Sequence, residues 1–138
     1  MTHKVITLHP DDLMKDAANI FETNNFHHIP VVDKGGKVVG ILSKVEYYKL
    51  QHGFTIFNVK TANKFNEDVF GALTVEEVMT EHVAKLFPED TLEQAMGYFR
   101  ENLFHAAPVV NKETKRIEGI VTTFDLLNYV FQETELLG

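Results

Sequence analysis

The two halves of this chain carry the same pattern of residues at a nearly constant spacing. The sequence Leu8-x-Pro10-x-Asp12 returns as Leu86-x-Pro88-x-Asp90. The same spacing relates Met1-Thr2 to Met79-Thr80 and Pro30-Val31-Val32 to Pro108-Val109-Val110, until the second copy gains one residue in the turn after Lys112. A repeated sequence of this kind folds into similar units, so we expect any site to occur twice or to lie between the copies.

Length and composition limit the class of protein. With 138 residues the chain is long enough for one compact domain, whereas each copy alone is short for a stable fold, so we expect one module with a shared core. There is no cysteine, which excludes disulfides and thiolate metal sites and fits a reducing compartment. The formal net charge of -7 argues against nucleic acid as a partner, because such binding depends on Lys and Arg at phosphates.

The sequence also predicts a soluble, cytoplasmic protein that does not enter a membrane. No apolar run approaches the roughly 20 residues that span a bilayer. The first residues, MTHKVITLHPDD, lack the apolar core of a secretory signal. A length of 138 residues leaves no room for an effector domain beside two copies, so we expect a stand-alone module.

Each copy reads as strand, helix, strand, strand, helix, which predicts an α+β fold. A short apolar segment, 5–8 or 83–86, precedes a helix with one apolar face, and Asp90 with Glu93 is the expected capping pair of the second such helix. Two β-rich runs around a polar turn predict hairpins at 29–32 with 38–42 and at 107–110 with 117–122. Final helices are expected at 44–52 and 124–136, and Thr74 to Glu77 reads as a capping box for a short helix.

The chain is therefore divided into repeat 1 at 1–52, an inter-repeat segment at 53–74 and repeat 2 at 75–138. The inter-repeat segment contains Phe54, Ile56, Phe57 and Val59 and is too apolar for a free tether, so we expect it to pack on the fold.

Several short motifs resemble a CBS domain. The second copy contains V-E-E-V-M-T, H-A-A-P-V-V and G-I-V-T-T-F-D-L, and the first contains M-T, H-H-I-P-V-V-D and G-I-L-S-K-V-E. In this order the motifs resemble a tandem CBS pair, or Bateman module. The resemblance implies two β-α-β-β-α repeats packed about a pseudo-twofold axis, with two clefts that bind AMP, ADP, ATP or S-adenosylmethionine. Such pairs are sensors, usually attached to an enzyme, channel or transporter.

The resemblance also implies binding residues. In the family the hydroxyl of the G-h-x-T-x-x-D motif faces phosphate and its Asp accepts from the ribose hydroxyls. Gly119, Thr122 and Asp125 match this motif, although a hydroxyl followed three residues later by an acid is equally a helix-capping box. In the first copy Gly40, Ser43 and Glu46 depart from the motif, and there the capping interpretation is favoured because Ser-x-x-Glu is the better capping box.

A second set of candidates precedes the strand proline. In CBS pairs these residues line the adenine pocket and face the acid motif of the other copy. By that arrangement Thr122 and Asp125 face Lys4, Phe26, His27 and His28, while Ser43 and Glu46 face His82, Val83, Phe104 and His105. The alternative roles are core packing for Phe26 and Phe104, and a structural hydrogen bond for His27 and His105.

Other chemistry finds little support in the sequence. The adjacent His27 and His28 would point to opposite faces of a strand, and no spacing typical of metal ligands occurs, so we expect no metal site. There is no nucleophile elbow, Walker loop or dinucleotide fingerprint, so we expect no catalytic residues and no enzyme.

The last helix has more apolar residues than one core contact needs. Phe124, Leu127 and Phe131 form one row along it, and Leu126, Val130 and Leu137 form another; the first copy offers Tyr47, Tyr48 and Leu50. We expect a homodimer through this helix, or a helix wedged between both copies. The leading hypothesis is a module that binds an adenosine-type ligand and acts on a separate effector protein. The alternative is a protein–protein interaction or dimerisation module with no bound nucleotide.

Overall fold

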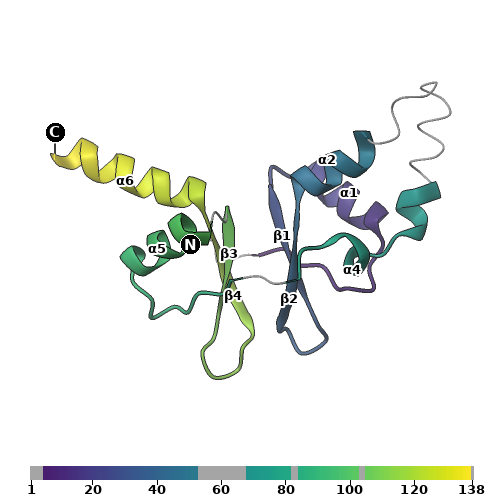
Figure 1. Ribbon diagram of the computed structural model, residues 1–138, viewed down its shortest axis with the longest axis horizontal. Helices are drawn as coiled ribbons and strands as arrows, with labels where there is room; N and C mark the ends of the chain where they lie inside the picture. The colour runs from purple at the N-terminus through teal and green to yellow at the C-terminus, as the bar shows by residue number, and fades with distance from the viewer. Residues whose placement is uncertain (1–4, 53–67, 82–83, 103–104, 138) are drawn as a thin grey trace. The chain divides into compact units, whose positions relative to one another are not determined.

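The computed structural model describes residues 5–52, 68–81, 84–102 and 105–137. The chain divides into two compact units, one formed by residues 6–82 and the other containing residues 83–138 (Figure 1). Each unit contains helices and one two-stranded antiparallel sheet. The predicted α+β class is therefore confirmed.

The sheet of the first unit is a hairpin of β1 (His28–Val32) and β2 (Val38–Ser43), in the register His28 to Ser43 and Pro30 to Ile41. Asp33 closes its turn by accepting the N–H groups of Gly35 and Lys37, and Gly36 has a φ of 83°. The backbone of Leu8 adds one parallel bridge to β1. The strand expected at 5–8 is thus reduced to a single bridge at Leu8, and Pro10, two residues later, has no N–H with which to continue the pairing.

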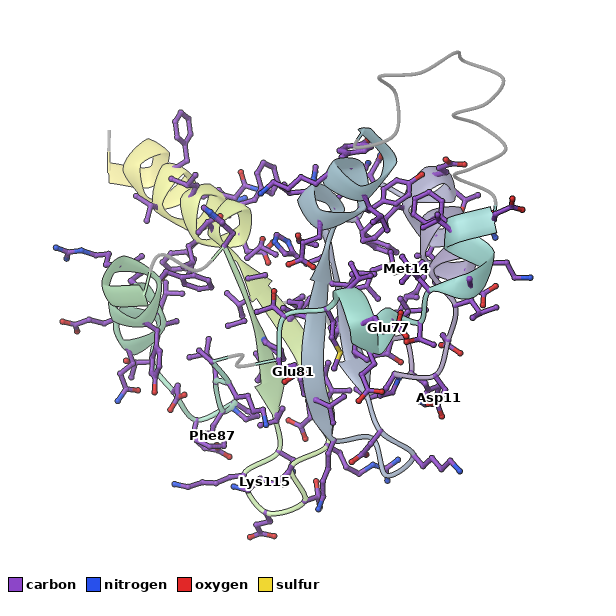
Figure 2. All side chains as sticks on the ribbon, turned by 45° about the vertical axis from the view of Figure 1, so that its right-hand side comes forward. Asp11, Met14, Glu77, Glu81, Phe87 and Lys115 are labelled. Atoms are coloured by element: carbon purple, nitrogen blue, oxygen red, sulfur yellow. The ribbon has the colours of Figure 1, made fainter. Side chains whose placement is uncertain are left out.

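The core of the first unit forms where α1 (Met14–Thr23) packs on this hairpin. Met14, Ala17 and Phe21 lie on one face of α1 and are fully or almost fully buried. In Figure 2, Met14 is labelled where it points into this core. The core also contains residues from the strands, from α2 (Lys44–His52) and from the segment that follows: Ile29, Val31, Leu42, Tyr47, Phe70 and Val75.

Residues from the start of the second sequence copy complete this same unit. Helix α4 (Val75–Val78) buries Val75, whose N–H donates to the carbonyl of Asp12. Thr80 and Ile41 then exchange two backbone hydrogen bonds of 2.9 and 3.0 Å along the edge of β2. The repeat in the sequence and the compact unit in space are therefore different divisions of the chain. Of the inter-repeat segment, residues 53–67 lie outside the described part, whereas residues 68–72 are helical.

The second unit repeats the hairpin with β3 (Ala106–Val110) and β4 (Ile117–Thr122), in the register Ala106 to Thr122. Leu86 adds a parallel bridge to β3, as Leu8 does to β1. Helix α5 (Leu92–Asn102) and helix α6 (Thr123–Leu137) complete the unit. Among the described residues, its buried core contains Leu86, Ala95, Phe99, Ala107, Val109 and Leu126.

The extra residue of the second copy lies in the turn between β3 and β4. Lys115 adopts a φ of 64° there, a conformation that a non-glycine residue rarely takes. Its ammonium group lies 5.2 Å from the ring centroid of Phe87, and both residues are labelled in Figure 2. The turn is thus longer than its counterpart and is held by a side chain on the segment that precedes α5.

Helix α5 is capped one residue later than the sequence indicated. Thr91 and Gln94 form the reciprocal box, with hydrogen bonds of 2.8 and 3.1 Å, whereas Asp90 accepts the N–H of Phe87. Thr74 makes no side-chain cap for α4, so the capping box expected there was wrong.

Candidate functional site

The acid motif of the second unit lies at the junction between β4 and α6. The N–H of Thr122 donates to Asp125 Oδ2 at 3.0 Å, and the N–H of Asp125 donates to Thr122 Oγ1 at 3.1 Å. This is the reciprocal capping box that was weighed as one interpretation of these residues. It uses one carboxylate oxygen and one lone pair of the hydroxyl. Within the described residues these bonds leave the hydroxyl proton of Thr122 and Asp125 Oδ1 available to a ligand.

The position of this pair favours anions and hydroxyl groups. Helix α6 is 15 residues long, and its first N–H groups carry the positive end of the helix dipole. Asp125 lies in the first turn, where its charge stabilises the helix. The junction therefore presents a hydroxyl and helix N–H donors for an anion, and a carboxylate oxygen for a hydroxyl donor.

In the first unit the matching acid has a different partner. The N–H of Glu46 donates to Ser43 Oγ at 3.1 Å, so the hydroxyl half of the expected capping box is present. The carboxylate, however, accepts the hydroxyl proton of Thr80, with Oε1 2.7 Å from Oγ1. Glu46 Oε2 is buried and has no hydrogen-bond partner in the described part of the chain.

The two motif glycines lie at equivalent register positions. Gly40 pairs with Val31 and Gly119 with Val109, and both glycines are buried. A Cβ atom on Gly40 would lie only 2.5 Å from Met79 Sδ and 2.9 Å from the carbonyl oxygen of Thr80. Because Gly40 has no side chain, residues 79–80 can lie directly against β2 in the first unit.

The histidines that precede the hairpins contact the acid motif of their own unit through the backbone. The carbonyl of His27 accepts the N–H of Lys44, and the carbonyl of His105 accepts the N–H of Thr123, at 2.8 and 2.9 Å. Both side chains are exposed, while Phe26 and His28 are half-buried. The structural hydrogen bond considered from sequence thus exists, but it is made by main-chain atoms. The candidates Lys4, His82, Val83 and Phe104 lie outside the described residues.

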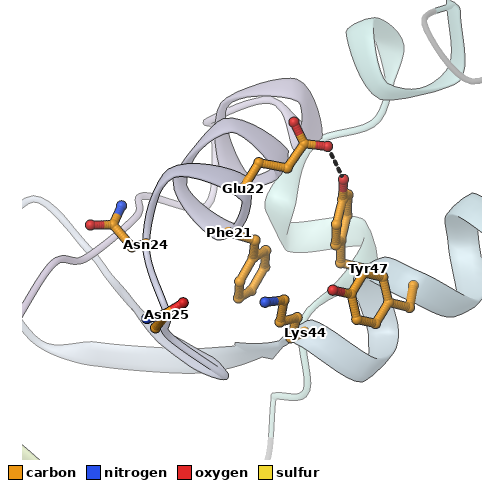
Figure 3. Close-up of a pocket in the computed structure, with 7 residues that line it drawn as sticks. Phe21, Glu22, Asn24, Asn25, Lys44 and Tyr47 are labelled. Atoms are coloured by element: carbon orange, nitrogen blue, oxygen red, sulfur yellow. Dashed lines mark hydrogen bonds between the residues drawn. The ribbon is translucent and has the colours of Figure 1, made fainter.

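A pocket of about 320 Å³ lies between the C-terminal end of α1 and the first turns of α2 (Figure 3). Phe21 and Tyr47, whose rings stack with centroids 5.5 Å apart, are its buried aromatic residues. The Tyr47 hydroxyl donates to Glu22 Oε1 at 2.8 Å. The pocket is also lined by Asn24, Asn25, Lys44 and Tyr48. It therefore offers an ammonium, a carboxylate and two carboxamides around aromatic rings.

Burial and the bond to Glu22 raise the pKa of Tyr47 above its usual range, so its hydroxyl stays protonated and acts as a donor. The sequence did not predict this pocket, because Tyr47 and Tyr48 were interpreted only as surplus apolar residues. A signal was available: the second copy has Leu126 and Leu127 at these positions, so the tyrosines are specific to the first copy. Among the described residues, no group of three or more His, Asp or Glu side chains could hold a metal ion.

The fold and its two junctions define a class of protein: a tandem of α+β units, each with a hydroxyl and an acid at the start of the helix that follows its hairpin. The model of the CBS domain matches residues 1–51 and again residues 75–132. The chain belongs to the CBS domain family, as its motifs predicted. In the described ranges, no helix combines the length and apolar character needed to cross a membrane.

Relatives of known sequence cover most of the chain. Protein MJ1225 of Methanocaldococcus jannaschii is 32% identical over 129 residues, which is 94% of this chain and 45% of that protein. Protein MJ1426 of the same organism is 32% identical over 143 residues, which is 90% of this chain and 84% of that protein. The chain thus spans less than half of the first relative and most of the second.

Solved structures share the fold. The crystal structure of MJ1225 matches with a TM-score of 0.75 and 28% identity, over 94% of this chain and 45% of that one. The CBS domain pair of protein MJ0100, in complex with 5'-methylthioadenosine and S-adenosyl-L-methionine, matches with a TM-score of 0.73 and 25% identity, over 94% and 93%.

Proposed function

We propose that this chain is a regulatory module that binds an adenosine-type ligand at its acid motifs and passes the binding state to a separate effector protein. The observation that carries the proposal is the Thr122 and Asp125 pair, which keeps a hydroxyl proton and a carboxylate oxygen available at the N-terminus of α6. The complex of the MJ0100 pair with 5'-methylthioadenosine and S-adenosyl-L-methionine supports the ligand class.

The chemistry of such a ligand fits the groups at this junction. A ribose supplies hydroxyl donors, and a hydroxyl bonded to a carboxylate gains more than one bonded to a neutral acceptor. The phosphate of AMP or the carboxylate of S-adenosylmethionine supplies an anion for the Thr122 hydroxyl and the helix N–H groups. No catalytic group is needed, because a sensor requires only differential binding between states.

The remaining contacts belong to the proposal. Thr122 and Asp125 would meet Lys4, Phe26, His27 and His28 around one ligand, and Ser43 and Glu46 would meet His82, Val83, Phe104 and His105 around another. This pairing uses the family arrangement with repeats at 1–52 and 75–138.

Calorimetric titration of the purified protein with AMP, ADP, ATP, S-adenosylmethionine and NADH tests the proposal. We expect saturable binding of at least one adenosine compound, and no binding of GMP as a control of equal charge to AMP. Failure of every adenosine compound to bind at millimolar concentration would contradict it and favour the alternative.

The alternative, an interaction module without nucleotide, is favoured by the surface of α6. Phe124, Leu127 and Phe131 are 69%, 67% and 71% exposed and lie on one side of the helix. Exposed apolar stripes of this kind mark protein interfaces. We propose that this stripe pairs with a second copy of the chain, and a homodimer is compatible with ligand binding as well as with the alternative.

A further inference from the structure

We propose that Thr80 is an internal competitor for the Glu46 carboxylate and thereby sets the affinity of the first acid motif for its ligand. This inference rests on the proposed function, since it assigns a regulating residue to one of the two proposed sites. It predicts that the first site is weakened by the chain itself, and that occupying it releases the Thr80 side chain from α2.

The hydrogen bond that carries the inference is short and joins residues far apart in sequence. Thr80 Oγ1 lies 2.7 Å from Glu46 Oε1. A hydroxyl has one proton, so in this arrangement Thr80 donates it to the carboxylate, as a ribose hydroxyl would. The longer side chain of Glu46, compared with Asp125, allows the carboxylate to reach the edge of β2 where Thr80 is bound.

The second carboxylate oxygen explains why a ligand can compete. Glu46 Oε2 is buried without a hydrogen-bond partner among the described residues, and such an oxygen is costly to leave unsatisfied. A ligand with two adjacent hydroxyls brings two donors, one to replace the Thr80 hydroxyl and one for Oε2. The competitor satisfies one oxygen, whereas the ligand satisfies both.

The release of Thr80 requires little rearrangement. Its main chain is held independently by the two hydrogen bonds to Ile41, and Met79 is seated against Gly40. Displacing the hydroxyl therefore needs a rotation of the Thr80 side chain, and the ligand must also uncover the buried Oε2 of Glu46. The second unit shows the contrast, because Asp125 there accepts the N–H of Thr122 within its own capping box.

The test isolates the first site with Asp125→Ala and then changes position 80. Thr80→Val removes the hydroxyl with almost the same shape, while Thr80→Ser keeps it as the matched control. With S-adenosylmethionine and AMP as probes, we expect Thr80→Val to tighten binding about tenfold in calorimetry, a typical effect of one hydrogen bond to a charged group. Thr80→Ser should bind as the Asp125→Ala parent does.

A measurement without ligand tests the bond itself. In a double-mutant cycle of urea unfolding, Thr80→Val and Glu46→Ala should each lower the midpoint, and the second substitution should add much less than the first. Additive midpoints would overturn the inference, as would an unchanged affinity in Thr80→Val. If the wild-type protein binds no probe, the proposed function fails. If Thr80→Val then gains binding, the role of Thr80 as a competitor for Glu46 is still supported. If Thr80→Val also binds no probe, that role is overturned.

Discussion

At the scale of single residues, the same motif position serves different purposes in the two units. Gly40 belongs to the motif that resembles a phosphate-binding sequence, yet in the structure it makes room for Met79 and Thr80. Glu46 was expected to cap its own helix, yet its carboxylate bonds to Thr80. Sequence spacing predicted neither contact, because each joins residues that are more than thirty positions apart and that only the folded chain brings together.

Substitution of Gly40 tests this close approach. In Gly40→Ala the new methyl would lie 2.5 Å from Met79 Sδ and 2.9 Å from the Thr80 carbonyl, so residues 79–80 must move away from β2. We expect a loss of about 1–3 kcal/mol in the free energy of unfolding, the usual cost of overpacking. Urea denaturation measures it.

The matched control for this substitution is Gly97→Ala in α5, where a Cβ atom meets nothing within 4 Å. Replacing a glycine inside a helix there should leave stability unchanged or raise it by up to about 1 kcal/mol. Equal effects of the two substitutions would contradict the assigned role of Gly40.

The environment of Tyr47 predicts how the stability of the folded protein depends on alkaline pH. In the unfolded chain it loses its proton near its ordinary pKa of 10.0, whereas burial and the bond to Glu22 keep the folded pKa higher. The protonated Tyr47 therefore contributes its full stabilisation of the folded state below pH 10. This contribution is lost as the pH rises above that value. Urea unfolding at pH 8 to 11 should show a steeper loss of stability in the wild type than in Tyr47→Phe, which also loses about 1 kcal/mol at neutral pH. Parallel pH curves would contradict the account.

At the scale of elements, the sequence predicted the types and the order of the helices and strands better than it predicted the residues at which they begin and end. Helices at 44–52 and 124–136 and both hairpins were recognised, because their apolar periodicity and polar turns act locally. The cap of α5 was misplaced because Thr91 and Asp90 are both good capping residues, and only the folded turn shows that Asp90 is engaged by Phe87. The exposed row on α6 was recognised as surplus apolar surface, and its pairing with a second copy remains a proposal.

A charge in that row tests the proposed homodimer. Phe131→Glu should convert a dimer to a monomer, since it places a carboxylate within an apolar contact, and its melting temperature should change little because Phe131 is 71% exposed. Light scattering at tens of micromolar provides the readout. Val45→Glu on α2, where the residue is 60% exposed outside this row, is the control that should leave the dimer intact. A wild-type monomer would contradict the proposal.

At the scale of the whole molecule, duplication explains both what was predictable and what was not. The repeat gave the family, the α+β class and two copies of the acid motif, because these depend on residue type and order. It did not predict that residues 75–80 complete the first unit, since a sequence period does not say which strand edge a segment pairs with. The pocket beside Tyr47 was missed because nothing repeats it.

The central claim is that Asp125 holds the ribose of an adenosine-type ligand, and calorimetry of two variants tests it most directly. Asp125→Ala removes the carboxylate and with it the acceptor of the Thr122 N–H in the capping box. Its melting temperature is therefore compared with that of Asp125→Asn, which keeps an acceptor for this N–H. We expect the strong binding phase of S-adenosylmethionine or AMP to weaken about tenfold to a hundredfold in Asp125→Ala, and to stay nearly intact in Glu46→Ala. Wild-type affinity in a folded Asp125→Ala protein would contradict the claim and leave Thr122 and Asp125 with a capping role alone.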